Sequence, residues 1–310
     1  MKALLFPGQG SQVVGMGLQF YKDFNIVKNI FEEADNKLKF KISKTILEGP
    51  ESELKLTQNT QPAILTVSYA IYKVIEKELN LKINDFKYFA GHSLGEYSAL
   101  VCAKSLKFTD ALYLLHERGK AMQEAVPIGK GGMLAVLGID IDQLENYIKK
   151  IKDNGICELA NDNAEGQIIV SGNIEKINIL KENLKNDKKK SILLPVSAPF
   201  HCSLMKSASE KMYEKINTIN FDNPDIEIIS NVTALPEKKQ ENIRRLLVEQ
   251  IYSKVRWRES ILYMKKNGVN EFIEIGPGKV LSGLVKRISK DSKSDSINSI
   301  DDAKKILNKL

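Results

Sequence analysis

The chain contains 310 residues, of which 43% are apolar and 27% are charged, and its formal net charge is +7. This composition is typical of an ordinary globular protein and leaves room for one domain with an insertion or for two domains. No apolar run approaches the ~18 residues of a membrane-spanning helix, and the short N-terminal run lacks a cleavage site. We therefore expect a cytoplasmic protein with no membrane partner.

The cysteines, the histidines and the charges argue against three further classes of protein. Cys102, Cys157 and Cys202 are scattered, and only three histidines are present, so we expect neither a disulfide framework nor a structural zinc site. The basic residues are spread along the chain and are not interleaved with aromatics, so nucleic acid is not an expected partner. Most of the positive charge is expected to be solvated surface, although the surplus would attract an acidic or phosphate-bearing partner.

The first 127 residues alternate between strands and helices. Lys2–Phe6 is an apolar run that predicts a buried strand, and a glycine-rich loop follows it. Short helices are predicted within residues 25–56. A longer helix is predicted to open at Pro62, because apolar side chains recur at helical spacing as far as Ile75 and proline suits the first helical position. The remaining elements of this part are a strand at Phe86–Ala90 and helices at Glu96–Ala103 and Phe108–Ala125.

A second pattern begins after the glycines and the proline of Pro127–Gly132. The next elements are predicted in the order β-α-β-β-α-β, which is the ferredoxin-like arrangement. The predicted strands are Met133–Leu137, Ile156–Ala160, Ile168–Val170 and Ile192–Val196, and the predicted helices are Ile141–Ile151 and Ile174–Leu184. We therefore predict a small subdomain at residues 128–196, inserted into a core formed by residues 1–127 and 197–310.

The C-terminal part resumes the alternation of the core. Its predicted helices are Leu204–Ile216, Ile243–Ser253, Arg258–Lys266 and Val280–Ile288, and its predicted strands are Ile226–Ser230 and Glu271–Ile275. Residues 289–302 are rich in serine, aspartate and lysine and are predicted to be loose, with a short helix at Ala303–Leu310 to close the chain. Strands that alternate with helices indicate an α/β fold with a mostly parallel sheet covered on both faces.

One short motif predicts a nucleophile. Gly91-His92-Ser93-Leu94-Gly95 matches Gly-x-Ser-x-Gly and lies between a predicted strand and a predicted helix, the setting of a nucleophile elbow. In such a turn the serine has a strained backbone and its hydroxyl stands clear of the sheet. The N–H of Leu94, at a helix N-terminus, would favour a developing negative charge. We predict Ser93 to be the nucleophile; the alternative is an ordinary glycine-rich turn.

A serine hydroxyl needs a base to act as a nucleophile at neutral pH, and the chain offers three histidines. His92 adjoins Ser93, but neighbouring side chains in a sharp turn diverge. His116 lies within a predicted helix, where a packed or surface role is expected. His201 follows a predicted strand in a loop, which is where α/β sheets place active-site groups. We predict His201 to be the base, with a packed structural histidine as the alternative.

Five segments, in this order and spacing, carry a family resemblance. They are Phe6-Pro-Gly-Gln-Gly-Ser-Gln12, Gly91-His-Ser-Leu-Gly-Glu96, Arg118-Gly-Lys-Ala-Met122, Pro199-Phe-His-Cys202 and Gly276-Pro-Gly-Lys279. Over nearly its full length the chain resembles the malonyl-CoA:acyl carrier protein transacylases of bacterial type II fatty acid synthesis. The resemblance implies an α/β-hydrolase-like core with a ferredoxin-like insertion. It also implies transfer of malonyl from malonyl-CoA to the phosphopantetheine thiol of acyl carrier protein, in ping-pong fashion, through a malonyl-serine ester.

The resemblance also implies roles for individual residues. Ser93 matches the nucleophile and His201 matches its base. The two backbone N–H groups of the family's oxyanion hole map to Gln9 and Leu94. In place of a carboxylate, the family uses a backbone carbonyl to orient the histidine, and Gln250 matches the residue that supplies it. A carbonyl can fix the tautomer but stabilises the imidazolium less than an aspartate does.

Arg118 distinguishes transfer of a dicarboxylic acyl group from simple ester hydrolysis. A guanidinium can hold the free malonyl carboxylate through two parallel hydrogen bonds; the alternative is a surface arginine paired with Glu117 or Glu124. Phe200 stands where related acyltransferases differ with acyl size, and an aromatic there resembles malonyl-selective members. Many simple members carry serine at this position, and one methyl clash rarely gives absolute selectivity.

Several alternatives remain open at this level. A serine hydrolase or thioesterase would share Ser93 and His201 but would have no use for Arg118, and a non-catalytic scaffold would need none of them. The turn at Gly276–Lys279 could brace the first glycine loop or be a plain strand–helix turn. Cys202 is expected to be a buried structural cysteine. We expect a monomer, and we expect no cofactor or metal, because exchange between an ester and a thioester involves no redox step.

Overall fold

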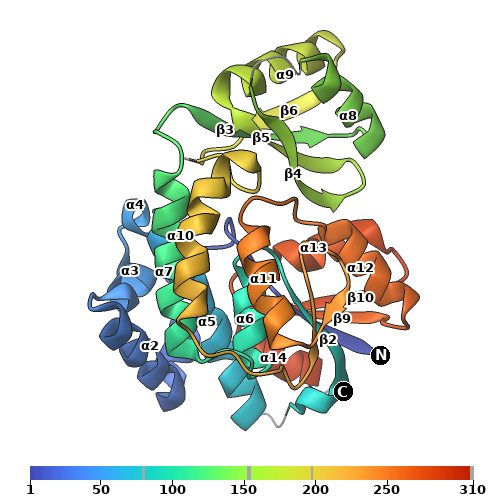
Figure 1. Cartoon of the computed structure of the whole chain (residues 1–310). Helices are drawn as coiled ribbons and strands as arrows, with labels where there is room; N and C mark the ends of the chain where they lie inside the picture. The colour runs from blue at the N-terminus through green and yellow to red at the C-terminus, as the bar shows by residue number, and fades with distance from the viewer. Residues whose placement is uncertain (79–80, 152–154, 197, 308–310) are drawn as a thin grey trace.

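The computed structural model describes residues 1–78, 81–151, 155–196 and 198–307. Figure 1 shows a larger unit with a smaller one above it. The chain leaves the larger unit after α7 (Phe108–Glu124) and re-enters it before α10 (Lys206–Asn217). Ser197, at which we predict the core to resume, lies outside the described residues. The chain boundaries of the two predicted parts therefore stay a prediction.

The larger unit is built on a six-stranded sheet with the order β10-β9-β1-β2-β7-β8. These strands are β10 (Lys293–Ile297), β9 (Glu271–Ile275), β1 (Lys2–Phe6), β2 (Phe86–Gly91), β7 (Glu227–Ile229) and β8 (Pro236–Glu237). All neighbours pair in parallel except β7 and β8. The carboxyl ends of β9, β1, β2 and β7 therefore meet at one edge of the sheet, where the loops that follow them form a single surface.

Side chains of β1 alternate between two hydrophobic clusters, one on each face of the sheet. Leu4 and Phe6 belong to the larger cluster, whereas Ala3 and Leu5 pack with Trp257 in the other. Because a strand buried on both faces has no polar side to offer, the near-continuous apolar run in the sequence indicates a central parallel strand. The α/β fold class that we predicted is confirmed.

Helices cover both faces of this sheet. On the side of Leu4 and Phe6, α5 packs against α7 and α2, and α10 packs against α7 and α11. The helices of the larger unit, besides α7 and α10, are α1 (Leu18–Asp23), α2 (Asn25–Leu38), α3 (Ile42–Glu48), α4 (Glu51–Leu54), α5 (Thr57–Glu78), α6 (Gly95–Cys102), α11 (Gln240–Gln250), α12 (Trp257–Lys266), α13 (Val280–Ile288) and α14 (Ile300–Leu307). Within the described ranges, no helix is long and apolar enough to cross a bilayer.

The smaller unit contains a four-stranded antiparallel sheet with two helices, in the sequence order β-α-β-β-α-β. Its elements are β3 (Gly131–Leu137), α8 (Ile141–Lys150), β4 (Cys157–Ala164), β5 (Gln167–Asn173), α9 (Ile174–Asn186) and β6 (Lys190–Leu193). The strand order β4-β5-β3-β6 confirms the predicted ferredoxin-like arrangement. Helices α8 and α9 cover one face, and Met133, Ala160 and Ile169 on the other face join the main hydrophobic cluster.

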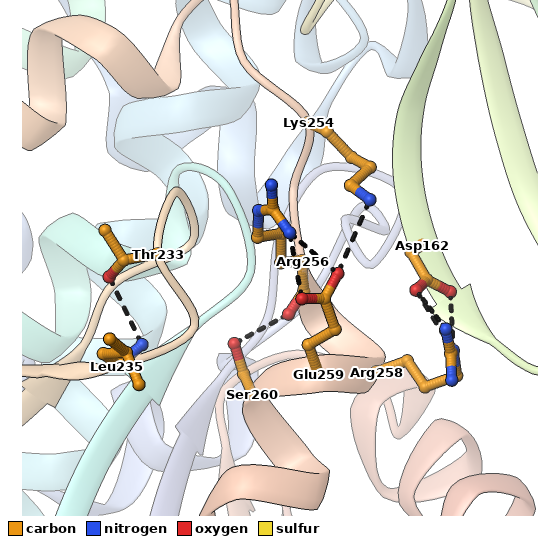
Figure 2. A network of polar contacts seen from close by, with 8 residues as sticks. All are labelled: Asp162, Thr233, Leu235, Lys254, Arg256, Arg258, Glu259 and Ser260. Atoms are coloured by element: carbon orange, nitrogen blue, oxygen red, sulfur yellow. Dashed lines mark hydrogen bonds and ion pairs between the residues drawn. The ribbon is translucent and has the colours of Figure 1, made fainter.

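Polar contacts tie the smaller unit to the chain segment that follows α11. The backbone of Val255 bonds to the edge strand β4, since its N–H donates to Ala160 and its carbonyl accepts from Asp162. Figure 2 shows Arg258, at the start of α12, facing the carboxylate of Asp162, which its Nε reaches at 2.9 Å. In the same view Lys254 and Arg256 share Glu259. The two units therefore meet through an ion pair and a short backbone ladder.

The predicted start of the long N-terminal helix was wrong. Helix α5 begins at Thr57 and carries Pro62 inside it. Proline has no N–H to donate, so the carbonyl of Gln58, one helical turn earlier, lacks its usual partner. That carbonyl instead bonds to Nδ1 of His116 at 2.9 Å. A neighbouring helix thus satisfies the group that the proline leaves free, which sequence periodicity could not foresee.

The prediction that residues 289–302 are loose was also wrong. Lys293–Ile297 forms β10, which pairs in parallel with β9, and α14 begins at Ile300. Ser294 and Ile297 are buried while most of their neighbours are exposed. Backbone pairing at an edge of the sheet holds β10, and such pairing does not require apolar side chains. The polar composition of the strand therefore left no apolar pattern in the sequence. Residues 308–310, the end of the predicted closing helix, lie outside the described part.

Candidate active site

The elbow between β2 and α6 holds Ser93 with a positive φ of 52°. The glycines on either side allow the backbone to fold closely. A Cβ on Gly91 would lie 1.9 Å from the backbone of Gly95, and a Cβ on Gly95 would lie 2.2 Å from the carbonyl oxygen of Phe6. Only glycine fits at both positions. The positive φ of Ser93, which lies between them, is the strained backbone conformation that the motif predicted.

An asparagine just after β7 holds the backbone on both sides of the elbow. The side chain of Asn231 accepts from the N–H of Ser93 at 2.6 Å and donates to the carbonyl of Gly91 at 2.7 Å. Since both backbone groups of the elbow are held by one buried amide, the turn keeps its strained shape without a ligand. Asn231 had no assigned role in the sequence, although its place after a parallel strand was a usable signal.

His201 faces the hydroxyl of Ser93. Its Nε2 lies 2.7 Å from Ser93 Oγ, and its Nδ1 lies 2.9 Å from the backbone carbonyl oxygen of Gln250. A carbonyl can only accept, so Nδ1 carries the proton and Nε2 is free to accept the proton of the serine. Burial, together with the charge of Arg118, lowers the pKa of His201 to about 3, so the imidazole is an uncharged base at neutral pH.

Arg118 lies on α7 and turns into the protein, with 1% of its surface exposed. Nη1 donates to Gln61 Oε1 at 2.7 Å, and Nη2 donates to Gln250 Oε1 at 2.9 Å and to Ser93 Oγ at 3.2 Å. Its Nε is buried and has no hydrogen-bond partner within the described residues. A buried donor without a partner, on a guanidinium that contacts the serine hydroxyl, is suited to an anionic oxygen of a ligand. The alternative of a surface arginine paired with a glutamate is wrong.

Gln250 links the charged groups of the site. Its backbone carbonyl orients His201, its side-chain oxygen accepts from Arg118, and its Nε2 donates to the carbonyl of Ser93 and to Glu96 Oε2. It is fully buried. One residue at the C-terminal end of α11 therefore positions the base, the cation and the elbow together.

The serine, the histidine and the arginine line one cavity of about 180 Å³ between the two units. Ser93, His201 and Arg118 share its wall with Gln9 and Leu94, and apolar side chains of the smaller unit complete it: Met133, Ile169, Leu194 and Val196. The structure thus brings together the sequence-predicted residues that come from four separate segments. Burial of the polar groups beside an apolar wall favours a dry site in which electrostatic contacts are strong.

Two backbone N–H groups and one aromatic ring complete the sequence-predicted set. Neither Gln9 nor Leu94 uses its N–H in a backbone hydrogen bond within the described ranges, and both residues line the cavity. They can therefore donate to an oxyanion formed at Ser93. Phe200 also lines the cavity and is 7% exposed, so its ring takes up part of the space there.

The other candidates of the sequence have structural contacts. His92 also lines the cavity, but its Nε2 lies 2.8 Å from Asn163 Oδ1 and its ring lies beside Trp257, whereas His201 makes the contact to Ser93 Oγ. Cys202 is buried and donates to the carbonyl of Pro199. The turn at Gly276 contacts the first glycine loop, since a Cβ there would lie 2.7 Å from Pro7, which favours the bracing role that was left open.

Three polar residues of the site were missed in the sequence: Gln61, Glu96 and Asn231. Gln61 precedes the proline of α5 and holds Arg118, and Glu96 closes the serine motif but was given no role. Their signals were weak, because a glutamine or a glutamate in a helix is most often solvated. Only tertiary packing shows that both are buried.

A strained serine, a neutral histidine and a buried arginine at the edge of a parallel sheet define a nucleophilic-serine enzyme with a place for an anionic acyl group. The family model of the acyl transferase domain matches residues 3–305. The chain is 46% identical over 299 residues to the malonyl CoA-acyl carrier protein transacylase of Bacillus subtilis, covering 96% of this chain and 93% of that protein. It is 39% identical over 297 residues to the protein of the same name from Escherichia coli, with 96% and 95% covered.

Solved structures agree with these relatives. An acyl-carrier-protein S-malonyltransferase from Bartonella henselae superposes with a TM-score of 0.96 at 43% identity, covering 99% of this chain and 98% of that one. A malonyl-transacylase solved in complex with its type II polyketide acyl carrier protein has a TM-score of 0.96 at 38% identity, with 100% and 99% covered. The chain belongs to the acyl transferase domain family and, within it, to the malonyl-CoA:acyl carrier protein transacylases.

Proposed function

We propose that this protein transfers the malonyl group of malonyl-CoA to the phosphopantetheine thiol of acyl carrier protein, by way of a malonyl ester on Ser93, and so supplies fatty acid chain elongation. The observation that carries the proposal is the position of one hydroxyl. Ser93 Oγ lies 2.7 Å from a neutral imidazole and 3.2 Å from a buried guanidinium. A general base and a carboxylate-binding group thus meet at the nucleophile.

In the first half-reaction, Ser93 Oγ attacks the thioester carbonyl while His201 Nε2 takes its proton. The N–H groups of Gln9 and Leu94 receive the negative charge of the tetrahedral intermediate. Collapse of that intermediate breaks the carbon–sulfur bond, and the imidazolium returns its proton to the leaving thiolate of coenzyme A. Throughout, Arg118 holds the distal carboxylate of the malonyl group.

In the second half-reaction, the thiol of the carrier's phosphopantetheine arm replaces coenzyme A in the same cavity. His201 takes the thiol proton, the sulfur attacks the ester carbonyl, and Ser93 leaves with the proton returned to it. A relative solved in complex with its acyl carrier protein supports the binding of a carrier by this enzyme. Neither half-reaction changes an oxidation state, so we propose that the enzyme needs no cofactor or metal.

The test is intact mass spectrometry after mixing with malonyl-CoA. We expect wild type to gain the mass of one malonyl group and to lose it again when holo acyl carrier protein is added, with malonyl appearing on the carrier. Ser93→Ala gains nothing. Release of free malonate at the rate of adduct loss, without a carrier, would instead identify a hydrolase. An adduct on Ser93→Ala would refute the assignment of the nucleophile.

Further expectations complete the proposal. We propose a cytoplasmic, monomeric enzyme whose partners are the acyl carrier protein and the coenzyme A thioester, with no nucleic acid or membrane bound. One small cavity lies between the two units and is lined by residues of both. This arrangement supports a complete site within one chain. Sedimentation equilibrium and activity in the presence of a metal chelator check the oligomeric state and the absence of a metal requirement.

A further inference from the structure

Glu96 is a buried carboxyl beside the reacting groups. It stands in the first turn of α6, three residues after Ser93, and 3% of its surface is exposed. Its Oε2 accepts from the backbone N–H of Asn231 at 3.1 Å and from Gln250 Nε2 at 2.7 Å. The carboxyl does not line the cavity in which the acyl group is placed, so any effect on the reaction passes through its neighbours.

The side-chain amide of Gln250 lies between Glu96 and Arg118. Its oxygen accepts from the guanidinium at 2.9 Å, and its nitrogen donates to the carboxyl at 2.7 Å. This orientation fits an ionised carboxyl, because a carboxylate only accepts hydrogen bonds. An amide with its oxygen toward the cation and its N–H toward the anion therefore joins two opposite charges.

The guanidinium has no closer counter-charge in the described part of the chain. Arg118 bonds to amide and hydroxyl oxygens of Gln61, Gln250 and Ser93. The other titratable groups near it are His201, whose pKa is lowered to about 3, and Tyr97 on α6, whose hydroxyl pKa burial raises to about 12, so both are uncharged near pH 7. Glu96 is thus left as the anion that balances Arg118.

Groups from several elements of the fold lie around the carboxyl of Glu96. Arg118 faces it from α7, Tyr97 adjoins it on α6, Gln250 donates from α11, and the loop at Asn231 supplies an N–H. Burial raises the pKa of Glu96 to about 7, against the opposing effects of these hydrogen bonds and of the guanidinium charge. A small change in nearby charge near neutral pH therefore changes the protonation of this carboxyl.

We propose that Glu96 is the counter-ion of Arg118 in the empty enzyme and that it takes up one proton when the malonyl carboxylate binds the guanidinium. Two carboxylates beside one guanidinium would leave a net negative charge in a buried site, which is costly, and the like charge favours protonation. The proton comes from solvent, the carboxylate becomes a carboxylic acid, and no other bond changes. Glu96 is a positioning residue, since it acts through Gln250.

This inference rests on the proposed function, because it needs a malonyl group at Arg118. The experiment mixes enzyme with malonyl-CoA at pH 7 in weak buffer containing a pH indicator, and quantifies the adduct by mass spectrometry. Acyl exchange itself consumes no proton at this pH. We expect wild type to take up a measurable fraction of one proton per malonyl adduct, and acetyl-CoA, which brings no carboxylate, to cause no uptake.

The matched variants are Glu96→Gln and Glu274→Gln. Glu274 is equally buried but caps α13 through Ser282 and Leu281, so its loss should leave the uptake unchanged, whereas Glu96→Gln should abolish it. In wild type, kcat/KM for loading should fall as the pH rises above 7, by up to about tenfold per unit, as expected for binding linked to one proton. In Glu96→Gln that slope should disappear.

The outcomes separate the two proposals. Absence of any adduct on wild type would refute the proposed function. An adduct without proton uptake, or uptake that persists in Glu96→Gln, would overturn the role of Glu96 and leave the function intact. The slope of kcat/KM in wild type needs no variant, so a flat profile between pH 7 and 8.5 would overturn the role even if Glu96→Gln failed to fold.

Discussion

Replacement of Arg118 by alanine should remove the preference for malonyl-CoA over acetyl-CoA. The guanidinium is buried, its Nη2 contacts Ser93 Oγ at 3.2 Å, and its Nε has no hydrogen-bond partner within the described residues. A malonyl carboxylate that accepts two charge-assisted hydrogen bonds gains about 1.5–3 kcal/mol from each. The total of about 3–6 kcal/mol corresponds to a factor of roughly 10² to 10⁴, at 1.4 kcal/mol per tenfold.

The assay is kcat/KM for adduct formation with each donor, because that quantity reports stabilisation of the transition state. The ratio of malonyl to acetyl cancels general damage, including the loss of partners for Gln61 and Gln250. We expect Arg118→Ala to lower the ratio by roughly 10² to 10⁴. Arg118→Lys should recover only part of it, since an ammonium keeps the charge but not the planar pair of donors.

Arg245 offers a matched control. Its side chain is 63% exposed and pairs with Glu249 one helical turn away, an interaction of about 0.3–0.5 kcal/mol at most. Arg245→Ala should therefore leave the donor ratio unchanged. A ratio in Arg118→Ala within about threefold of wild type, a difference well under 1 kcal/mol, would show that the guanidinium does not hold the carboxylate, and the proposed substrate position would be wrong.

Four further predictions concern the elbow, the ion pair between the two units, the pKa of the base and the net charge. Gly95→Ala should abolish adduct formation, because the new Cβ would lie 2.2 Å from the carbonyl oxygen of Phe6; a malonyl adduct at wild-type rate would contradict the close approach. Arg258→Ala should lower the free energy of unfolding by about 1–3 kcal/mol in urea titrations, since the buried Asp162 loses its partner; no change would show that the ion pair is not stabilising. Because the pKa of His201 is lowered to about 3, rapid-quench loading rates should show no acid limb near pH 6.5; a limb there would mean an ordinary imidazole. The net charge of +7 predicts that the carrier is acidic, so raising ionic strength should slow transfer to the carrier more than loading; equal effects would exclude steering.

The sequence alone determined the parts of the fold that depend on local pattern. The apolar run of β1 and the helical spacing within α5 identify their elements, because burial leaves a periodic trace in composition. The order β-α-β-β-α-β between residues 131 and 193 identified the second sheet in the same way. The glycines around Ser93 were informative because a sharp turn admits no other residue there. By contrast, β10 is polar and left no such trace.

The residues of the site also divide into those that the sequence could identify and those that only the tertiary structure revealed. Ser93 stands in a local motif and His201 in a loop after a predicted strand, so both were predicted from the residues, and the resemblance to a known family supplied the role of Arg118. The resemblance also implied that the carbonyl of Gln250 orients His201, but tertiary structure alone showed that the side-chain amide of Gln250 joins Arg118 to Glu96. The reason is physical: a polar residue in a helix looks solvated until neighbouring elements bury it, and its charge and partners are set by groups that lie far away in the chain.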